Sequence, residues 1–422
     1  MAVLKGRHAD FTMKPSDFDS DEDEKILHEL FRAYFDARRN KRNTLSALAF
    51  ERRFEPEIFS MFDELREGRY EPKPSICFVV ERPVKREIFA ADFRDRVIHH
   101  LIYNHLSPVF EKIFINDSYS CREGRGVHYG VSRLDHFMRS CSENYSRECY
   151  VMKADIRGYF MSIDRHLLFS KISDMMPSVP APTARYRKLL LCLVEKTIFN
   201  DPTRNCIMRG DSSDWRGLPS DKTLFCARKD CGLPIGNLTS QLFGNIYLNH
   251  LDHFIKRDLG VRYYGRYVDD IVMVHRECGH LKSALAEIVK YLKGHLMLDL
   301  HTGKTYLQTV SKGVRYLGAV IKPHRIYISK RTKGNFYESI RRYNRIAEDH
   351  PPGESECAAF LSSMNSYLGI MKHYKTYKIR KQMIGRNLSK AWWKVACLNG
   401  KGEKFVLTGR KRVGRRQRRS IN

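Results

Sequence analysis

The chain has 422 residues, of which 42% are hydrophobic, and this is enough for two or three subdomains around a sizeable core. With 75 Lys and Arg against 48 Asp and Glu, its formal net charge of +27 favours a polyanionic partner, nucleic acid rather than an anionic membrane surface. No apolar run of about 18 residues and no cleavable leader is visible, and the eleven irregularly spaced cysteines are typical of reduced thiols, so we expect a cytoplasmic protein without membrane contact.

Hydrophobic periodicity predicts the elements in chain order. Residues 1–70 form an N-terminal helical extension in this prediction, with helical spacing from about residue 25 to 68. Strands are expected at 76–80, at 149–154 and twice within 263–275. Helices are expected at 95–106, 186–199, 241–257, 281–293, 334–347, 355–372 and 378–390.

Two segments have a composition of their own. Residues 200–232 are rich in Pro, Gly and Asp and are predicted to be a long surface insertion. No strand is expected after about residue 330, and residues 396–422 end in clustered Arg and Lys, which predicts a basic nucleic-acid-binding tail. The whole pattern predicts an α+β body, then a helical appendage, then this tail.

The sharpest local motif is Tyr267-Val268-Asp269-Asp270, with apolar strand residues on both sides. Two adjacent carboxylates at the tip of a hydrophobic hairpin repel each other unless a cation is held there. For these four residues alone, a solvated hairpin turn is the alternative.

A third carboxylate strengthens the metal interpretation. Asp155 ends the predicted strand at 149–154. A strand-end Asp beside a hairpin Asp-Asp pair suits two Mg²⁺ ions, or Mn²⁺ in their place, about 3.5–4 Å apart. Three Asp without a His or Cys cluster match the oxygen ligands that Mg²⁺ prefers.

At this point the sequence resembles the reverse transcriptases, over roughly residues 75–390. Seven blocks recur in the family's order, and the fourth and fifth are 233–241 and the Tyr267–Asp270 motif. The others are Arg86–Arg96, Ser118–His128, Asp155–Phe160, Leu298–Thr305 and Gly313–Gly318. The resemblance implies a right-hand polymerase with fingers at 71–145, a palm at 146–328 that contains the 200–232 insertion, and a helical thumb at 329–395.

The resemblance also implies roles for individual residues. Asp155, Asp269 and Asp270 would bind the metal ions together with the main-chain carbonyl of Ile156, and Lys304 would protonate pyrophosphate. The incoming nucleotide would be held by Lys85, Arg86, Phe160, Ile235, Gly236 and Gln241, with Phe160 excluding the sugar 2′-hydroxyl. Primer and template would contact Arg122, Tyr316, Leu317 and Gly318. An ordinary strand and turn, or for Lys304 a surface position, are the alternatives.

One block departs from most of the superfamily, which has Gln-Gly where this chain has Ile235-Gly236 and Ser-Pro where it has Ser240-Gln241. In this respect it looks like the reverse transcriptases of diversity-generating retroelements, bacterial or phage-encoded enzymes that copy a template RNA with errors at adenines, aided by a small basic accessory protein. Because Ile cannot hydrogen-bond the incoming nucleotide, base-pair geometry would be checked less strictly.

Three other functions remain open. Antiphage-defence reverse transcriptases, which make a cDNA from an associated non-coding RNA, also vary at this block. A palm-fold protein that binds RNA without polymerising would be expected to lack a catalytic Asp or the Gly-Lys pair at Lys304. An RNA-templated RNA polymerase shares the palm, but the bulky ring of Phe160 argues against it. Template RNA, a cDNA primer and dNTPs are the expected partners, with an accessory protein or a second copy of the chain.

Overall fold

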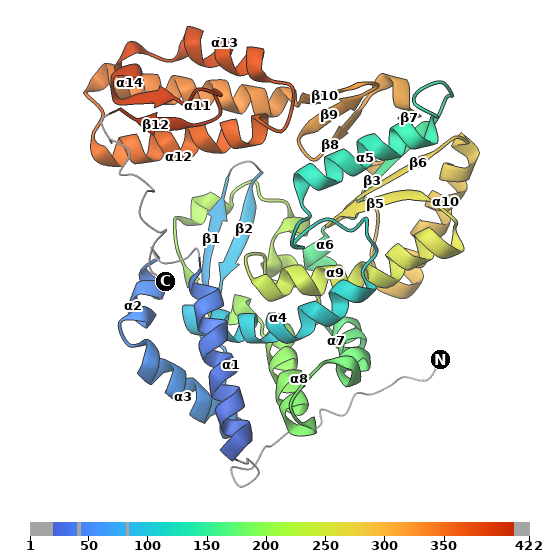
Figure 1. Cartoon of the computed structure of the whole chain (residues 1–422). Coiled ribbons are helices and arrows are strands. Elements are labelled where there is room, and N and C mark those ends of the chain that lie inside the picture. Colours follow the sequence, from blue (N-terminus) through green and yellow to red (C-terminus); the bar gives the residue numbers. More distant parts are fainter. Residues whose placement is uncertain (1–19, 40–43, 82–83, 409–422) are drawn as a thin grey trace, which may run out of the picture. The chain divides into compact units, whose positions relative to one another are not determined.

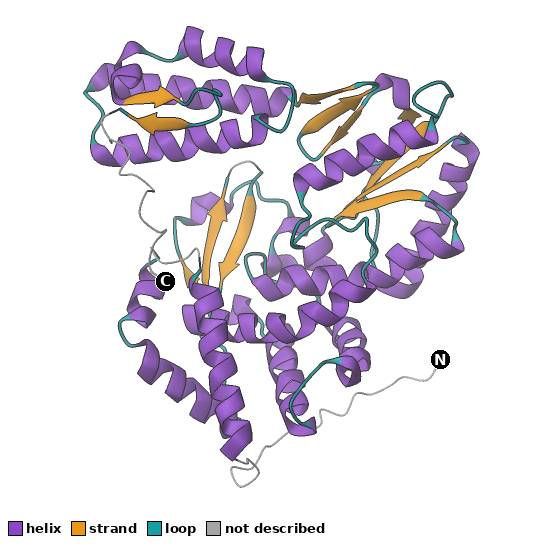
Figure 2. Ribbon diagram, in the orientation of Figure 1, coloured by secondary structure: helices purple, strands orange, loops and turns teal. Residues whose placement is uncertain are grey.

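The computed structural model describes residues 20–39, 44–81 and 84–408 (Figure 1). It divides into two units. The first unit comprises the described parts of 1–126 and 152–307, and the second those of 127–151 and 308–422. Each mixes helices with short β-sheets (Figure 2). The α+β prediction is therefore confirmed.

The first unit begins with helices that pack on the long helix α4 (Phe93–Ile113). Asp92 caps α4 by accepting a hydrogen bond from the main-chain N–H of Arg94 (3.0 Å). Tyr34 of the first helix is buried and stacks on Phe54 with a centroid distance of 5.1 Å. The three N-terminal helices are α1 (Ser20–Arg38), α2 (Leu45–Glu51) and α3 (Phe54–Arg66).

A three-stranded sheet follows, in the order β2-β1-β4. Strand β1 (Ile76–Val80) was predicted, whereas its antiparallel partner β2 (Arg86–Ala90) was not. The third strand, β4 (Ile207–Met208), comes from the predicted insertion and pairs with β1 in parallel. The insertion is thus built into a sheet rather than loosely attached.

A four-stranded sheet has the order β5-β6-β3-β7. Its strands are β3 (Tyr150–Asp155), β5 (Tyr263–Tyr267), β6 (Asp270–His275) and β7 (Tyr306–Thr309). The surrounding helices are α6 (Tyr159–Ser162), α7 (Arg165–Met175), α8 (Ala184–Phe199), α9 (Leu238–His253) and α10 (Cys278–Tyr291). The predicted strands at 149–154 and 263–275 and the helices at 186–199, 241–257 and 281–293 correspond to these elements.

The second unit contains helix α5 (Val127–Cys141), which packs on strand β9 of a three-stranded antiparallel sheet. That sheet consists of β8 (Val314–Tyr316), β9 (Ala319–Lys322) and β10 (Arg325–Ile328). Four further helices share one hydrophobic core: α11 (Lys330–Asp349), α12 (Glu354–Met371), α13 (Tyr377–Asn387) and α14 (Lys390–Val395).

The expectation that no strand follows residue 330 is wrong. A hairpin of β11 (Ala396–Leu398) and β12 (Phe405–Leu407) lies among helices α11–α14 (Figure 1). It forms because Ala396 and Phe405 complete the helical core, where both are buried. The start of the predicted basic tail is therefore structured, and its remainder, 409–422, lies outside the described residues, as do residues 1–19.

All eleven cysteines carry free thiols. Across the part of the chain that the structure describes, no helix has the length and apolar character needed to cross a bilayer.

Candidate active site

The two adjacent carboxylates lie where the β5–β6 hairpin reverses direction. Tyr267 pairs with Asp270, which leaves Val268 and Asp269 as the turn. Val268 has φ +55°, a left-handed conformation that is unfavourable for a β-branched residue. Its N–H donates to Ser120 Oγ (3.3 Å) and its carbonyl accepts from Arg266 Nη1 (2.9 Å). Two specific contacts thus hold a strained turn at the point where the chemistry is expected.

Arg266 is itself fixed by a fully buried ion pair. Its Nε and Nη2 each donate to Asp252 of α9, both at 2.7 Å, and the two side chains are fully excluded from solvent. Tyr264 donates a third hydrogen bond to Asp252, at 2.5 Å. A bidentate pair of this kind restricts orientation strongly, so the guanidinium is a rigid support for the Val268 carbonyl.

Asp155 and Asp269 are brought together by the sheet. The N–H of Ile156 donates to the Asp269 carbonyl (3.2 Å), which joins the end of β3 to the hairpin turn. Burial, with the neighbouring negative charges of Asp155 and Asp270, raises the pKa of Asp269 to about 6. Lys304 Nζ forms an ion pair with Asp155. Partial burial opposes ionisation of this lysine, but the contact with Asp155 prevails and raises its pKa.

Asp270 points to a different partner. Its Oδ1 forms an ion pair with Lys153 Nζ of β3 at 2.8 Å. Within the described ranges, no group of three or more His, Cys, Asp or Glu side chains is arranged to hold a metal ion. The chemistry of the donor set still fits a divalent cation at Asp155 and Asp269, because these two carboxylates repel each other and the pKa of Asp269 is raised.

The nucleotide-site block is attached to strand β2. The Ile235 carbonyl accepts from the N–H of Phe89 (2.9 Å), and Asn237 Oδ1 accepts from the N–H of Ala91 (3.2 Å). Gly236 has φ +125°, and a Cβ there would lie 2.9 Å from Ile88, so this position requires glycine.

The side chains of this block lie in different surroundings. Phe160 of α6 and Ile235 both pack against a small core formed by Cys77, Phe89, Met161 and Leu224. Gln241, in the first turn of α9, is exposed. Among the predicted nucleotide-binding residues, Phe160 and Ile235 are therefore packed apolar side chains, and the Gln241 amide is exposed.

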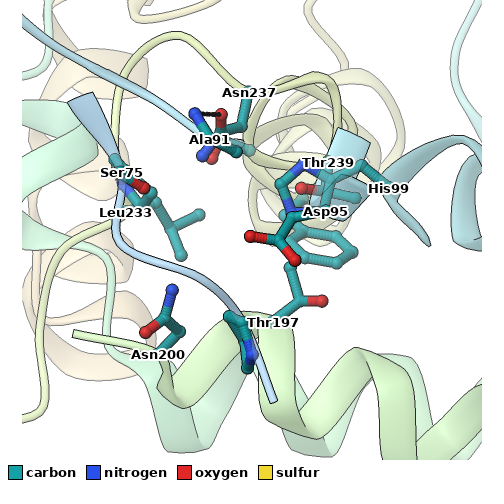
Figure 3. A pocket seen from close by; sticks show the side chains of 13 residues that line it. Ser75, Ala91, Asp95, His99, Thr197, Asn200, Leu233, Asn237 and Thr239 are labelled. Atoms are coloured by element: carbon teal, nitrogen blue, oxygen red, sulfur yellow. Dashed lines mark hydrogen bonds between the residues drawn. The ribbon is translucent and has the colours of Figure 1, made fainter. Parts of the chain in front are cut away.

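Beside this block lies a small polar cavity of about 20 Å³, enough for one water molecule (Figure 3). Asp95 and His99 of α4 line it together with Asn237 and Thr239. Burial raises the pKa of Asp95 to about 6 and lowers the pKa of His99 to about 3. The cavity is too small for a nucleotide, so its role here is structural.

The predicted phosphate and primer ligands differ in their surroundings. Lys85 Nζ donates to the Arg216 carbonyl of the insertion (2.9 Å), and Arg86 is exposed at the start of β2. Arg122 is buried and donates to Glu111 (2.8 Å) and to the carbonyls of Ile115 and Ser118. These contacts favour a structural role for Arg122 over the predicted contact with primer or template.

The predicted primer-positioning residues form the β8–β9 turn of the second unit. Tyr316 is buried at the end of β8. Leu317 and Gly318 adopt left-handed conformations with φ +46° and +82°. The family block therefore coincides with a tight hairpin turn.

Sequence reasoning missed several supporting residues. Lys153 and Arg266 are charged residues inside otherwise apolar strands, and such an interruption signals a buried partner. Asp252 lies on helix α9, most of which is buried. The partners themselves could not be read from the sequence.

The chain matches one family model and several known proteins. A family model described as reverse transcriptase (RNA-dependent DNA polymerase) matches residues 82–321. The chain is similar to protein YkfC of Escherichia coli (strain K12), with 24% identity over 330 residues that cover 69% of this chain and 76% of YkfC. It is also similar to the group II intron-encoded protein LtrA of Lactococcus lactis subsp. cremoris, with 21% identity over 243 residues, 57% of this chain and 35% of LtrA.

Two solved telomerase structures are more distant. For apo telomerase from Candida tropicalis, truncated from its C-terminal domain, the TM-score is 0.44 with 12% identity, covering 61% of this chain and 56% of that one. For telomerase from Candida albicans with a fragment of telomeric RNA, the TM-score is 0.45 with 11% identity, covering 75% and 55%. The chain thus spans little more than half of either telomerase.

The family model covers more than half of the chain and includes the strand-end Asp155, the nucleotide-site block and the Tyr267–Asp270 turn. These segments are the ones that converge in the first unit. The chain belongs to the reverse transcriptase family, with bacterial relatives and the right-hand polymerase fold, and is an RNA-directed DNA polymerase.

Proposed function

We propose that the protein extends a primer on an RNA template by two-metal phosphoryl transfer from dNTPs. The observation that carries this proposal is the meeting of Asp155 and Asp269 at the end of β3 and the β5–β6 turn, with Lys304 against Asp155. Fingers at 71–145, palm at 146–328 and thumb at 329–395 are the functional division that we propose with it.

Mg²⁺ or Mn²⁺ held by Asp155 and Asp269 would supply activation of the primer 3′-hydroxyl and charge stabilisation at the triphosphate. In this proposed step the primer 3′-hydroxyl gives up its proton to solvent water, a bond forms between the 3′-oxygen and the α-phosphorus, and the bond from that phosphorus to pyrophosphate breaks. Lys304 Nζ donates a proton to the departing pyrophosphate. Lys85 and Arg86 donate hydrogen bonds to the triphosphate oxygens.

The remaining residues position the reactants in this proposal. Phe160 lies against the sugar and excludes a 2′-hydroxyl, and Gly236 lets the main chain approach the nucleotide. Asp270 orients Lys153 through their ion pair and adds negative charge beside the metal ligands. Leu317 and Gly318 support the primer end.

We further propose that copying is error-prone and serves a diversity-generating retroelement, in the cytoplasm, with a small basic accessory protein or a second copy of the chain as partner. The supporting observation is that the Ile235 side chain packs into an apolar core and offers no hydrogen bond to the nascent pair. The alternative is a defence reverse transcriptase, for which the cDNA itself is the useful product.

The direct test is Asp269→Asn, which removes a charge but little volume. Primer extension on a defined RNA template with Mg²⁺ should fall by about a hundredfold or more, while RNA binding is retained. The matched control is Asp258→Asn, because Asp258 is an exposed carboxylate in the helical turn that follows α9. An Asp269→Asn enzyme that extends primers at the wild-type rate contradicts the proposal.

A further inference from the structure

The 200–232 insertion has no role in the mechanism described above, yet it contacts the nucleotide site repeatedly. Its main attachment is Glu87 of β2, whose side chain is 1% exposed. Trp215 Nε1, Thr223 Oγ1 and the Leu224 N–H all donate to the Glu87 carboxylate, each at 2.8 Å. A buried carboxylate that loses its donors is costly, so β2 and the insertion are held together at this point.

A second attachment runs along the sheet. Strand β4 of the insertion extends β1, with Ile207 N–H donating to Ser75 O and Arg209 N–H to Cys77 O, both at 2.8 Å. Since β1 also pairs with β2 across the hairpin, the insertion is bound to both strands of the hairpin that carries Lys85 and Arg86. The Lys85 ammonium donates to the Arg216 carbonyl from the same segment.

The third attachment lies between the metal ligand Asp155 and the side chain of Phe160. Gly158 has φ +51°, and a Cβ there would lie 2.8 Å from the Asp221 carbonyl, so the insertion covers this turn without space for a side chain. Arg157 Nε forms an ion pair with Asp221 at 3.3 Å. The turn that sets the direction of α6, and therefore of Phe160, is thus in contact with the insertion.

The same segment also supports the two side chains that are proposed to face the nucleotide. Leu224 is a member of the small buried core, and Phe160, Ile235 and Trp215 pack against it. A shift of Trp215 or Leu224 would change the packing of Phe160 and Ile235 together, because close-packed cores transmit small displacements.

We infer that the 200–232 insertion is a selectivity brace for the nucleotide site. Its residues Trp215, Thr223 and Leu224 hold Glu87 in place. The insertion thereby positions Phe160 for discrimination of the sugar and Ile235 for discrimination of the base pair. This inference rests on the proposed nucleotide-site roles of Phe160 and Ile235. Glu87, Trp215 and Thr223 are positioning residues, since they act through other side chains and not on the substrate.

The test uses two conservative variants of the full-length protein. Trp215→Phe keeps an aromatic ring but removes the Nε1 donor, and Thr223→Val keeps the shape but removes the hydroxyl. The matched control is Thr203→Val, because Thr203 donates to Asp201 (2.7 Å) within the insertion and not to Glu87. For each variant, kcat and KM for dNTPs, the ratio of rNTP to dNTP incorporation and the affinity for a primer–template duplex are measured.

We expect both brace variants to raise the KM for dNTPs and the rNTP:dNTP ratio by about three- to tenfold, with primer–template affinity unchanged. The Thr203→Val control should behave like the wild type. Unchanged KM and sugar selectivity in folded Thr223→Val protein would overturn the inference. If Trp215→Phe is too unstable to assay, the milder Thr223→Val variant alone tests the inference.

A second comparison separates the role of the brace from the role of Phe160, the side chain that the brace is inferred to position. In a Phe160→Ala background, Thr223→Val should add no further change in sugar selectivity, because the side chain being positioned is absent. If Phe160→Ala alone leaves the rNTP:dNTP ratio unchanged, the proposed role of Phe160 fails. If Phe160→Ala raises the ratio and Thr223→Val does not, the brace alone fails.

Discussion

Asp269 is buried beside two other carboxylates, although the proposed reaction needs its side chain in the charged form. Burial and the charges of Asp155 and Asp270 raise its pKa to about 6, whereas an unfolded Asp titrates near 4. A carboxyl with a raised folded pKa stabilises the fold below its unfolded pKa, and this stabilisation is lost as the pH rises through about 6. Above that pH, the ionised side chain opposes folding.

Asp269→Asn should therefore stabilise the metal-free protein at pH 8 while abolishing activity. We expect the free energy of unfolding in EDTA to rise by about 2–3 kcal/mol, and the gain to shrink as the pH is lowered toward 5. Urea unfolding at both pH values measures the effect, with Asp258→Asn as the control. A variant less stable than the wild type at pH 8 would show that Asp269 makes favourable contacts that outweigh its charge.

Phe160 combines a packing contact with a proposed functional one, because it touches the small core and also lies near α9, where Gly244 is close to its ring. We expect Phe160→Ala to accept ribonucleotides, since the clash with a 2′-hydroxyl is removed. The rNTP:dNTP incorporation ratio of variant and wild type measures this. An equal ratio would leave Phe160 as a core residue only, and a wild type that already prefers rNTPs would support the RNA polymerase alternative.

Among the elements of the second unit, the β11–β12 hairpin is part of the helical core. Asn365 of α12 accepts from the Phe405 N–H (2.7 Å) and donates to the Phe405 carbonyl (3.0 Å), while the Phe405 ring is buried among the helices. Residues 396–408 therefore stabilise the helical core.

Truncation after Thr408 should leave the second unit folded and remove seven Lys and Arg. RNA affinity should fall, and the slope of log K against log salt should flatten by about 0.7–0.9 for each phosphate that the shortened chain no longer neutralises. Truncation after Val395 should instead lower the thermal unfolding temperature, because Ala396 and Phe405 leave the core. An unchanged salt slope after the shorter truncation would make the terminal segment a docking site for protein or a solubility appendage.

The biological role of the whole protein depends on whether the cell uses the copying errors of the enzyme or the cDNA that it makes. Ile235→Gln should raise fidelity, because an amide can hydrogen-bond the nascent pair and apolar pockets discriminate poorly. The gain should concentrate opposite template adenines if the protein serves a diversity-generating retroelement. Sequencing cDNA made by both proteins on one defined RNA measures errors by template base. A wild type that is accurate at adenine would exclude the mutagenic role and favour antiphage defence.

The family and most of the helices could be recognised from the amino-acid sequence, and Asp155, Asp269 and Asp270 were predicted from it as metal ligands. These follow from local signals, such as Asp155 at the end of an apolar strand and the Tyr267–Asp270 motif between two others. The sequence did not reveal β2, because Arg86–Ala90 lacks a clear alternation of polar and apolar residues, nor β11 and β12, which are three residues each.

The partners of the buried charged groups are visible only in the folded chain. Lys153 pairs with Asp270, Arg266 with Asp252, and Glu87 with Trp215, which lies 128 residues away in the chain. Each contact depends on how strands are ordered in a sheet and on which segment covers a buried charge. The hydrophobic periodicity of a segment predicts which of its faces is buried, but it does not identify the residues that pack against that face.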